Sequence, residues 1–195
     1  MKDKTRALII DTASELFYKK GYNLTGINEI IAEAGIAKAT LYSHFKSKED
    51  LCIAYLVAKD ANLLENIKLH CASKAKGDKR MIAVLDFLIP FFQTNEFNGC
   101  WCIRTIAEIP RENIAIKKRI KHNKNMFLDF VKEIVKENTT KLTKAKQEKL
   151  AKRIYLLYET AVSESHLQSE IWPIEESIDL LKNILKNLKL SKATN

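Results

Sequence analysis

Hydrophobic residues recur along most of this chain with the period of an α-helix. The first helix is expected over residues 3–20, and four residues share its apolar face: Ile9, Ala13, Leu16 and Phe17. Gly21 follows at the position where helices commonly end. Two shorter helices are expected over 27–34 and 38–45, with a break at Gly35 between them. The first part of the chain therefore predicts three helices joined by short turns.

The helical pattern continues through the rest of the chain. Ser47 begins the next helix, with Asp50 three residues later in an arrangement like a capping box. The further helices are expected over 47–69, 81–94, 100–109, 112–136, 143–169 and the segment after Pro173. The last two carry apolar stripes, formed by Leu150, Ile154, Leu157 and Ala161 and by Ile174, Ile178, Leu181, Leu185 and Leu188. The pattern predicts an all-α fold of about nine helices.

Composition supports this fold and places the protein in the cytoplasm. The 195 residues are 46% hydrophobic and include five Gly and three Pro, so both helix breakers are scarce. No apolar stretch approaches the roughly 18 residues of a membrane span, and the first residues lack the apolar core of a signal peptide. In the cytoplasm we expect Cys52, Cys71, Cys100 and Cys102 to stay reduced.

Charge and cysteine spacing narrow the function classes. The net charge of +9 suggests an anionic partner, but residues 1–46 hold seven Lys or Arg against five Asp or Glu, so charge alone locates no site. Cys100 and Cys102, two residues apart on a helix, point to different sides and make a poor chelate. We expect no metal or cofactor, and no catalytic motif indicates an enzyme. A redox-sensing thiol at Cys100 or Cys102 remains an alternative.

Residues 21–51 have the pattern of a helix-turn-helix. Five apolar residues can pack together as its core: Ile27, Ile30, Ile31, Leu41 and Phe45. A helix that enters the major groove of DNA needs small or polar residues on its outer face, because bulky apolar residues would block the base edges. The helix over 38–45 meets this need with Lys38, Ala39, Thr40, Tyr42, Ser43 and His44.

The same segment contains a combination of short motifs. They are Phe17 in the first helix, the pair Gly21-Tyr22, and a Tyr-x-His-Phe-x-x-Lys run at Tyr42, His44, Phe45 and Lys48. With these motifs, residues 7–51 resemble the tetracycline-repressor (TetR) family of bacterial transcription regulators. The resemblance implies a DNA-binding domain over 1–47 and a helical ligand-binding and dimerisation domain over 48–195.

The resemblance also implies roles for individual residues. Phosphate contacts are expected from Thr25, Tyr42, His44 and Lys48, and base-edge contacts from Lys38, Ala39, Thr40 and Ser43. Lys48 would lie in the first turn of a helix, where backbone amides favour a phosphate. Three residues depart from the family pattern, because Ala37 replaces a Ser or Thr cap, Gly26 a common Thr or Ser, and Ile31 a common Ala.

The expected partners are an inverted-repeat DNA operator, a second copy of the chain and a small apolar or aromatic inducer. The inducer pocket is expected to include Phe91, Trp101, Arg104, Phe127, Tyr155 and Tyr158. Further polar groups that could orient a ligand are Glu108, His122, Glu159 and His166. The apolar stripes of the last two helices would form the subunit contact, unless they pack within one chain. A repressor released by its inducer is the leading hypothesis; a redox-sensing regulator and a helical adaptor that does not bind DNA are the alternatives.

Overall fold

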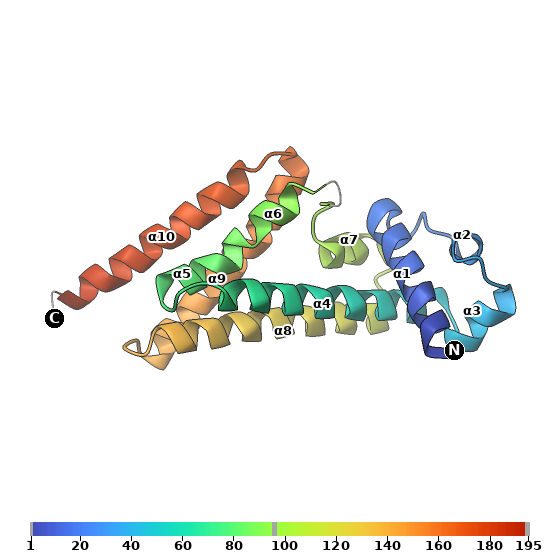
Figure 1. Ribbon diagram of the computed structural model, residues 1–195, viewed down its shortest axis with the longest axis horizontal. Helices are drawn as coiled ribbons and strands as arrows, with labels where there is room; N and C mark the ends of the chain where they lie inside the picture. The colour runs from blue at the N-terminus through green and yellow to red at the C-terminus, as the bar shows by residue number, and fades with distance from the viewer. Residues whose placement is uncertain (1, 95–96, 194–195) are drawn as a thin grey trace. The chain divides into compact units, whose positions relative to one another are not determined.

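The computed structural model describes residues 2–94 and 97–193, and these form ten α-helices without a β-strand (Figure 1). The predicted all-α class is confirmed. One more helix is present than expected, because the apolar run after Gly77 forms two helices, α5 (Asp78–Asp86) and α6 (Leu88–Phe92). Pro90 explains the break, since it has no N–H to donate to the carbonyl of Asp86.

The chain divides into two compact units. The first contains the residues up to Leu63 and Trp101–Lys124, and the second contains Leu64–Cys100 and the residues from Asn125 onward. Helices α4 (Lys48–Ala72) and α8 (Ile114–Asn138) each contribute to both units. The DNA-binding domain expected over 1–47 lies within the first unit, and its boundary stays a prediction.

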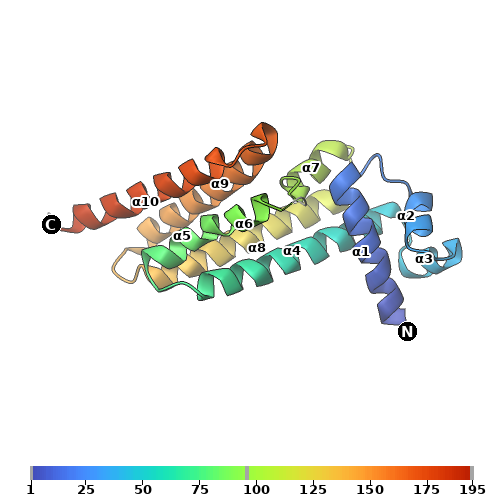
Figure 2. The same cartoon turned by 45° about the horizontal axis from the view of Figure 1, so that its top comes forward.

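The first unit begins with α1 (Lys2–Lys20), α2 (Ile27–Glu33) and α3 (Lys38–His44), which Figure 2 shows as a three-helix group. The predicted inner face of α1 is buried at Ile9, Ala13 and Phe17, whereas Leu16 is half-buried. Ile30 of α2 and Leu41 and Phe45 at α3 are buried as well, whereas Ile27 and Ile31 are half-buried. The apolar residues of the predicted helix-turn-helix therefore do form a core.

Side-chain caps stabilise the N-terminal starts of the two long helices, α4 and α8. The Ser47 hydroxyl accepts a hydrogen bond from the backbone N–H of Asp50 at 3.0 Å, which confirms the predicted cap before α4. The Asn113 side chain accepts one from the N–H of Ile116 at 3.0 Å and begins α8 in the same way. Helix α7 (Trp101–Glu108), which precedes α8 in the chain, is the remaining helix of this unit.

The second unit is built around α9 (Lys144–Gln168) and α10 (Trp172–Ala193), which lie side by side in Figures 1 and 2. Both predicted stripes face the core of this unit: Leu150, Ile154, Ala161, Ile174, Ile178, Leu181 and Leu185 are buried, and Leu157 and Leu188 pack against them. The prediction that these stripes form the subunit contact is therefore corrected. They pack within one chain and are therefore not available for a subunit contact.

Candidate DNA-binding site

Helix α3 exposes the residues that the sequence assigned to base recognition. Lys38, Ala39, Tyr42 and Ser43 are exposed, and Thr40 and His44 are half-buried. Leu41, on the opposite side of the helix, has no exposed surface. The outer face of α3 therefore carries small or polar side chains and one tyrosine, as a helix in the major groove requires.

The starts of α2 and α3 depend on packing rather than on caps. Helix α3 begins after Ala37 and α2 begins after Gly26, and neither residue has a polar side chain that could bind a free backbone N–H. Alanine in place of a capping residue costs about 1 kcal/mol, and glycine costs only about a few tenths of a kcal/mol. The positions of both helices therefore depend on the segments that hold them, in particular on the corner between α1 and α2.

Lys48 is the first residue of α4, as the resemblance implied. Its ammonium group lies 4.4 Å from the centre of the Tyr22 ring, in cation–π contact. Partial burial lowers the pKa of Lys48, while the nearby Cys52 and Glu108 favour its charged form. Tyr22 therefore positions the Lys48 ammonium group at the N-terminus of a helix, where the predicted phosphate contact would be made.

Thr25 differs from its expected role. The residue is fully buried, and its hydroxyl donates a hydrogen bond of 2.7 Å to the carbonyl of Gly21. This bond closes the corner between α1 and α2. The side-chain phosphate contact implied for Thr25 is therefore corrected, because its hydroxyl is not presented to DNA.

A basic groove of about 610 Å³ lies beside the end of α3, between α1 and α4. Arg6, His44 and Lys46 are among its lining residues, and the Arg6 guanidinium lies 5.1 Å from the centre of the Phe45 ring. The lining also includes Asp50, so the excess of basic side chains is small, and it favours an anionic partner at this end of α3 only in part.

The predicted inducer-binding residues are distributed over both units. Phe127, Tyr155 and Tyr158 come together in the second unit, with ring centres 4.4 Å apart for Phe127 and Tyr158 and 6.1 Å apart for Phe127 and Tyr155. Phe91 belongs to another aromatic group of that unit, since its ring packs on Phe97 at 5.4 Å. The structure thus brings together three of the six residues, and the role of the set stays a prediction.

The other two residues, Trp101 and Arg104, belong to α7 in the first unit. Trp101 packs edge-on against Tyr18 of α1 at 6.2 Å, and its buried indole N–H has no hydrogen-bond partner among the described residues. Arg104 donates to the backbone carbonyls of Tyr18 at 2.9 Å and Lys19 at 3.2 Å. Its guanidinium is therefore engaged with α1, which the sequence did not indicate.

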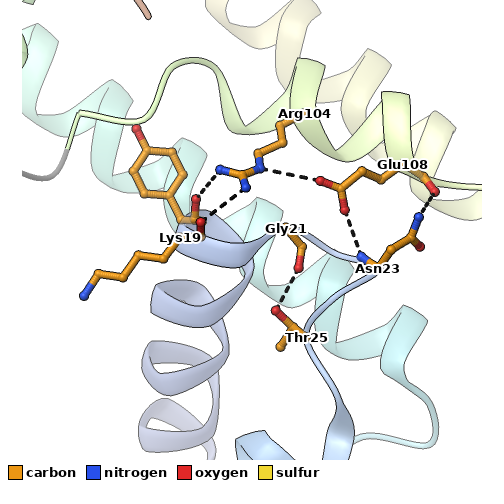
Figure 3. A network of polar contacts seen from close by, with 7 residues as sticks. Lys19, Gly21, Asn23, Thr25, Arg104 and Glu108 are labelled. Atoms are coloured by element: carbon orange, nitrogen blue, oxygen red, sulfur yellow. Dashed lines mark hydrogen bonds and ion pairs between the residues drawn. The ribbon is translucent and has the colours of Figure 1, made fainter. Parts of the chain in front are cut away.

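The contact between Glu108 and Asn23 is the feature that sequence reasoning missed at this end of the molecule. The Asn23 N–H donates to a carboxylate oxygen of Glu108 at 2.8 Å, and the Asn23 side chain donates to the Glu108 carbonyl at 2.8 Å (Figure 3). The two residues are 85 positions apart. No local pattern could have paired them.

The cysteines are free thiols in largely apolar surroundings. Burial raises the pKa of Cys52 and Cys71 to about 12, and Cys102 is also buried, whereas Cys100 is half-buried. Over residues 2–94 and 97–193, the His, Cys, Asp and Glu side chains form no group of three that could hold a metal ion. Within the same ranges, no helix has the length and apolar character needed to cross a membrane.

Comparison with known proteins identifies the family. Residues 9–55 match the family described as "Bacterial regulatory proteins, tetR family". The structure is similar to the crystal structure of a TetR-family transcriptional regulator from Streptomyces coelicolor, with a TM-score of 0.83 and 25% identity, covering 95% of this chain and 96% of that one. Residues 9–55 thus have the sequence of a TetR-family regulator, and the chain has the fold of one. The matched segment contains all of the predicted DNA-binding residues and none of the predicted inducer-binding residues of this chain.

Two similar curated proteins are named as regulators. The chain is 30% identical over 92 residues to the HTH-type transcriptional activator FasR of Mycolicibacterium smegmatis, which covers 47% of this chain and 42% of FasR. It is 26% identical over 129 residues to the fatty acid metabolism regulator protein of Bacillus subtilis, which covers 66% of this chain and 65% of that protein. The matches thus span less than two thirds of either relative.

Proposed function

We propose that this protein is a dimeric transcription regulator that binds an inverted-repeat operator in double-stranded DNA and leaves it when a small apolar or aromatic ligand binds. One observation carries the DNA-binding part of the proposal. Helix α3 belongs to a helix-turn-helix in which Ile30, Leu41 and Phe45 are buried, while the outer face of α3 exposes Lys38, Ala39, Tyr42 and Ser43. Small and polar side chains on such a face can approach base edges in the major groove.

The side chains of this face divide into two roles. Lys38, Ala39, Thr40 and Ser43 would contact base edges, and Tyr42, His44 and Lys48 would contact phosphates. Lysine can donate to the acceptors of guanine in the major groove, and such a contact contributes to base preference. Phosphate contacts contribute affinity for any sequence and are weakened by salt.

An operator selection tests this proposal. The full-length protein is used to enrich genomic DNA fragments, and the enriched sequence is compared with scrambled DNA in gel-shift titrations. We expect an inverted repeat to be enriched. Lys38→Ala should then lose about 10- to 100-fold in affinity for the operator but little for scrambled DNA.

Lys76→Ala is the matched control, because Lys76 is an exposed lysine of the second unit and its loss changes net charge equally. It should bind like the wild type. If no sequence is enriched, or if both variants behave alike, the proposed reading of DNA by α3 is wrong.

The subunit contact is proposed on the outer faces of α9 and α10. Apolar side chains remain exposed there although the stripes on the inner faces are buried: Leu156 is 61% exposed and Leu180 is 45% exposed. Leu167 and Trp172 add to the same faces. Burying such side chains between two copies removes apolar surface from water, and a two-fold dimer presents two helix-turn-helix motifs to two half-sites.

The double variant Leu156→Glu and Leu180→Glu should therefore be monomeric in light scattering. Leu69→Glu is the control, because Leu69 is 64% exposed on α4 and lies outside the proposed contact. We expect the control to remain dimeric. A double variant that stays dimeric would place the contact elsewhere.

The ligand-binding part of the proposal rests on two buried polar atoms that lack a hydrogen-bond partner among the described residues. In the second unit, Ser165 is fully buried and its hydroxyl has no hydrogen-bond partner among the described residues, on the same helix as Tyr155 and Tyr158. Buried polar atoms are normally satisfied, so an unpaired one is a candidate for contact with a ligand or water. The buried indole N–H of Trp101 in the first unit is a second such atom.

Fluorescence titration of a Trp172→Phe variant, in which Trp101 is the remaining tryptophan, tests ligand binding. The name of the Bacillus subtilis relative makes fatty acids the first probes to try. A ligand should change the Trp101 emission and release operator DNA at the same concentrations. A compound that changes the emission but leaves DNA binding intact is not the inducer.

A further inference from the structure

Helix α7 contacts the corner between α1 and α2 through two charged residues. Figure 3 shows Arg104 and Glu108 facing the end of α1 and the segment that follows it. Both residues lie in the first unit with that corner, and both side chains are partly buried, with 29% and 24% of their surfaces exposed.

Arg104 satisfies the C-terminal end of α1. Its guanidinium donates to the carbonyl of Tyr18 at 2.9 Å and to that of Lys19 at 3.2 Å, in the last turn of the helix. The last carbonyls of a helix lack partners within the helix, and this end carries partial negative charge. A cation that bridges two of these carbonyls therefore stabilises the end of α1 and fixes α7 to it.

Glu108 holds the segment that follows. One carboxylate oxygen lies 3.5 Å from Nε of Arg104, and the other accepts a hydrogen bond of 2.8 Å from the N–H of Asn23. The Asn23 side chain returns a second hydrogen bond to the Glu108 carbonyl at 2.8 Å. Two hydrogen bonds between the same two residues fix both the position and the direction of the chain at Asn23.

The corner itself is shaped to accept this carboxylate. Gly21 has a φ of +92°, and a Cβ at this residue would lie 2.2 Å from an oxygen of Glu108. Two residues after Asn23, the buried hydroxyl of Thr25 closes the corner by donating to Gly21. Because Gly26 offers no side-chain cap, the direction in which α2 leaves this corner depends on the bonds made at residues 21–25.

We propose that Arg104 and Glu108 are positioning residues for DNA recognition, which hold the corner between α1 and α2 and thereby orient the recognition helix α3. The inference rests on the proposed DNA-binding function. In this proposal neither Arg104 nor Glu108 contacts DNA. They act through Asn23 and the backbone of α1, while α3 follows α2 after a short turn.

The test compares Glu108→Gln with Glu112→Gln in the full-length protein. Both substitutions remove one negative charge at nearly constant size, and Glu112 is exposed after the end of α7. Charge alone would make both variants bind any DNA slightly more tightly. We expect Glu108→Gln instead to lose about tenfold or more in affinity for the operator and to keep its affinity for scrambled DNA, while Glu112→Gln keeps its preference for the operator.

Hydrogen exchange provides a readout that a general loss of stability would not reproduce. In Glu108→Gln, the amides of residues 21–26 should exchange about tenfold faster or more, while those of α9 keep their wild-type protection. If Glu108→Gln lowers protection throughout the protein, Asn23→Ala serves in its place, because it removes one bond to Glu108 and keeps the backbone bond.

The inference would be overturned if Glu108→Gln and Asn23→Ala both kept the wild-type affinity for the operator and the wild-type hydrogen exchange at residues 21–26. Faster exchange at these residues with an unchanged preference for the operator would also overturn it, because the corner would then not govern DNA recognition. Failure of the wild-type protein itself to select any operator is a different result, which overturns the proposed function.

Discussion

Replacing Gly21 with alanine should destabilise the first unit strongly, because two separate costs meet at this residue. Its φ of +92° lies in a region that an L-residue adopts at a cost of about 1–2 kcal/mol. The new Cβ would also lie 2.2 Å from a carboxylate oxygen of Glu108, which is inside any contact distance. A side chain can normally swing away from such a clash, but the carboxylate of Glu108 is held by Asn23 and Arg104.

The magnitude follows from the bonds that must break. Moving Glu108 removes the hydrogen bond from the Asn23 N–H to a charged acceptor, a loss of about 1.5–3 kcal/mol. The partly exposed ion pair with Arg104 adds at most about 1 kcal/mol. Alanine restricts the unfolded chain and recovers about 0.5 kcal/mol. Together with the backbone strain of about 1–2 kcal/mol, we therefore expect Gly21→Ala to lower the free energy of unfolding by about 2–5.5 kcal/mol.

The clash and the backbone strain separate in a double-mutant cycle. In a Glu108→Ala background the strain remains but the clash is gone, so Gly21→Ala should cost about 1 kcal/mol. Gly35→Ala is the control, because Gly35 has a φ of +63° and open space where its Cβ would lie. Its cost should be about 1 kcal/mol in both backgrounds.

Urea denaturation at one protein concentration measures all of these variants. Trp101 fluorescence in a Trp172→Phe background reports on the first unit, to which Trp101 belongs. The coupling between Gly21→Ala and Glu108→Ala should be at least about 1.5 kcal/mol. Equal costs of Gly21→Ala with and without Glu108 would refute the conclusion that Glu108 constrains this corner.

The remaining predictions concern Lys48, Ser47 and two buried cysteines. Lys48→Ala should weaken binding to operator and scrambled DNA alike and reduce the slope of log affinity against log salt by about two units per dimer, since each phosphate contact contributes about 0.9. Ser47→Ala should lower the free energy of unfolding by about 1 kcal/mol, because it removes the cap of α4. Burial raises the pKa of Cys52 and Cys71 to about 12, so both thiols should react slowly with iodoacetamide at pH 8 unless urea is present. Since a thiol ionises near pH 9 in the unfolded chain, thiol ionisation should lower stability as pH rises above that value and leave it unchanged below.

Local signals in the sequence predicted much of the fold and of the DNA-binding face. The cap at Ser47 and the buried face of α1 depend on residues within a few positions of each other, and both are present. The exposed face of α3 also follows from its own period, because Leu41 and Phe45 identify the inner side. Such features are set within one helix, so a single sequence is enough to find them.

Features that depend on distant parts of the chain were not predictable in this way. The apolar stripes that include Ile154 of α9 and Ile178 of α10 were correctly placed on one side of each helix. Periodicity does not tell whether the residues that pack against a stripe come from the same chain or from a second copy. Arg104 is the clearer case, because its partners are two backbone carbonyls that are 86 and 85 residues away. A bond to a backbone carbonyl requires no particular side chain there, so the sequence of α1 contains no sign of it.

The pair Gly21-Tyr22 shows why this family motif has a physical basis in the present chain. Gly21 leaves room for the Glu108 carboxylate, and Tyr22 places its ring under the ammonium of Lys48. Two adjacent residues thus connect the contact made by α7 with the proposed phosphate contact of α4. Lys48 itself is the first residue of α4, and the start of that helix is capped by Ser47 rather than held by this corner. A loosened corner should therefore impair base reading by α3 and leave phosphate binding by Lys48 in place, which is why affinity for scrambled DNA should survive Glu108→Gln.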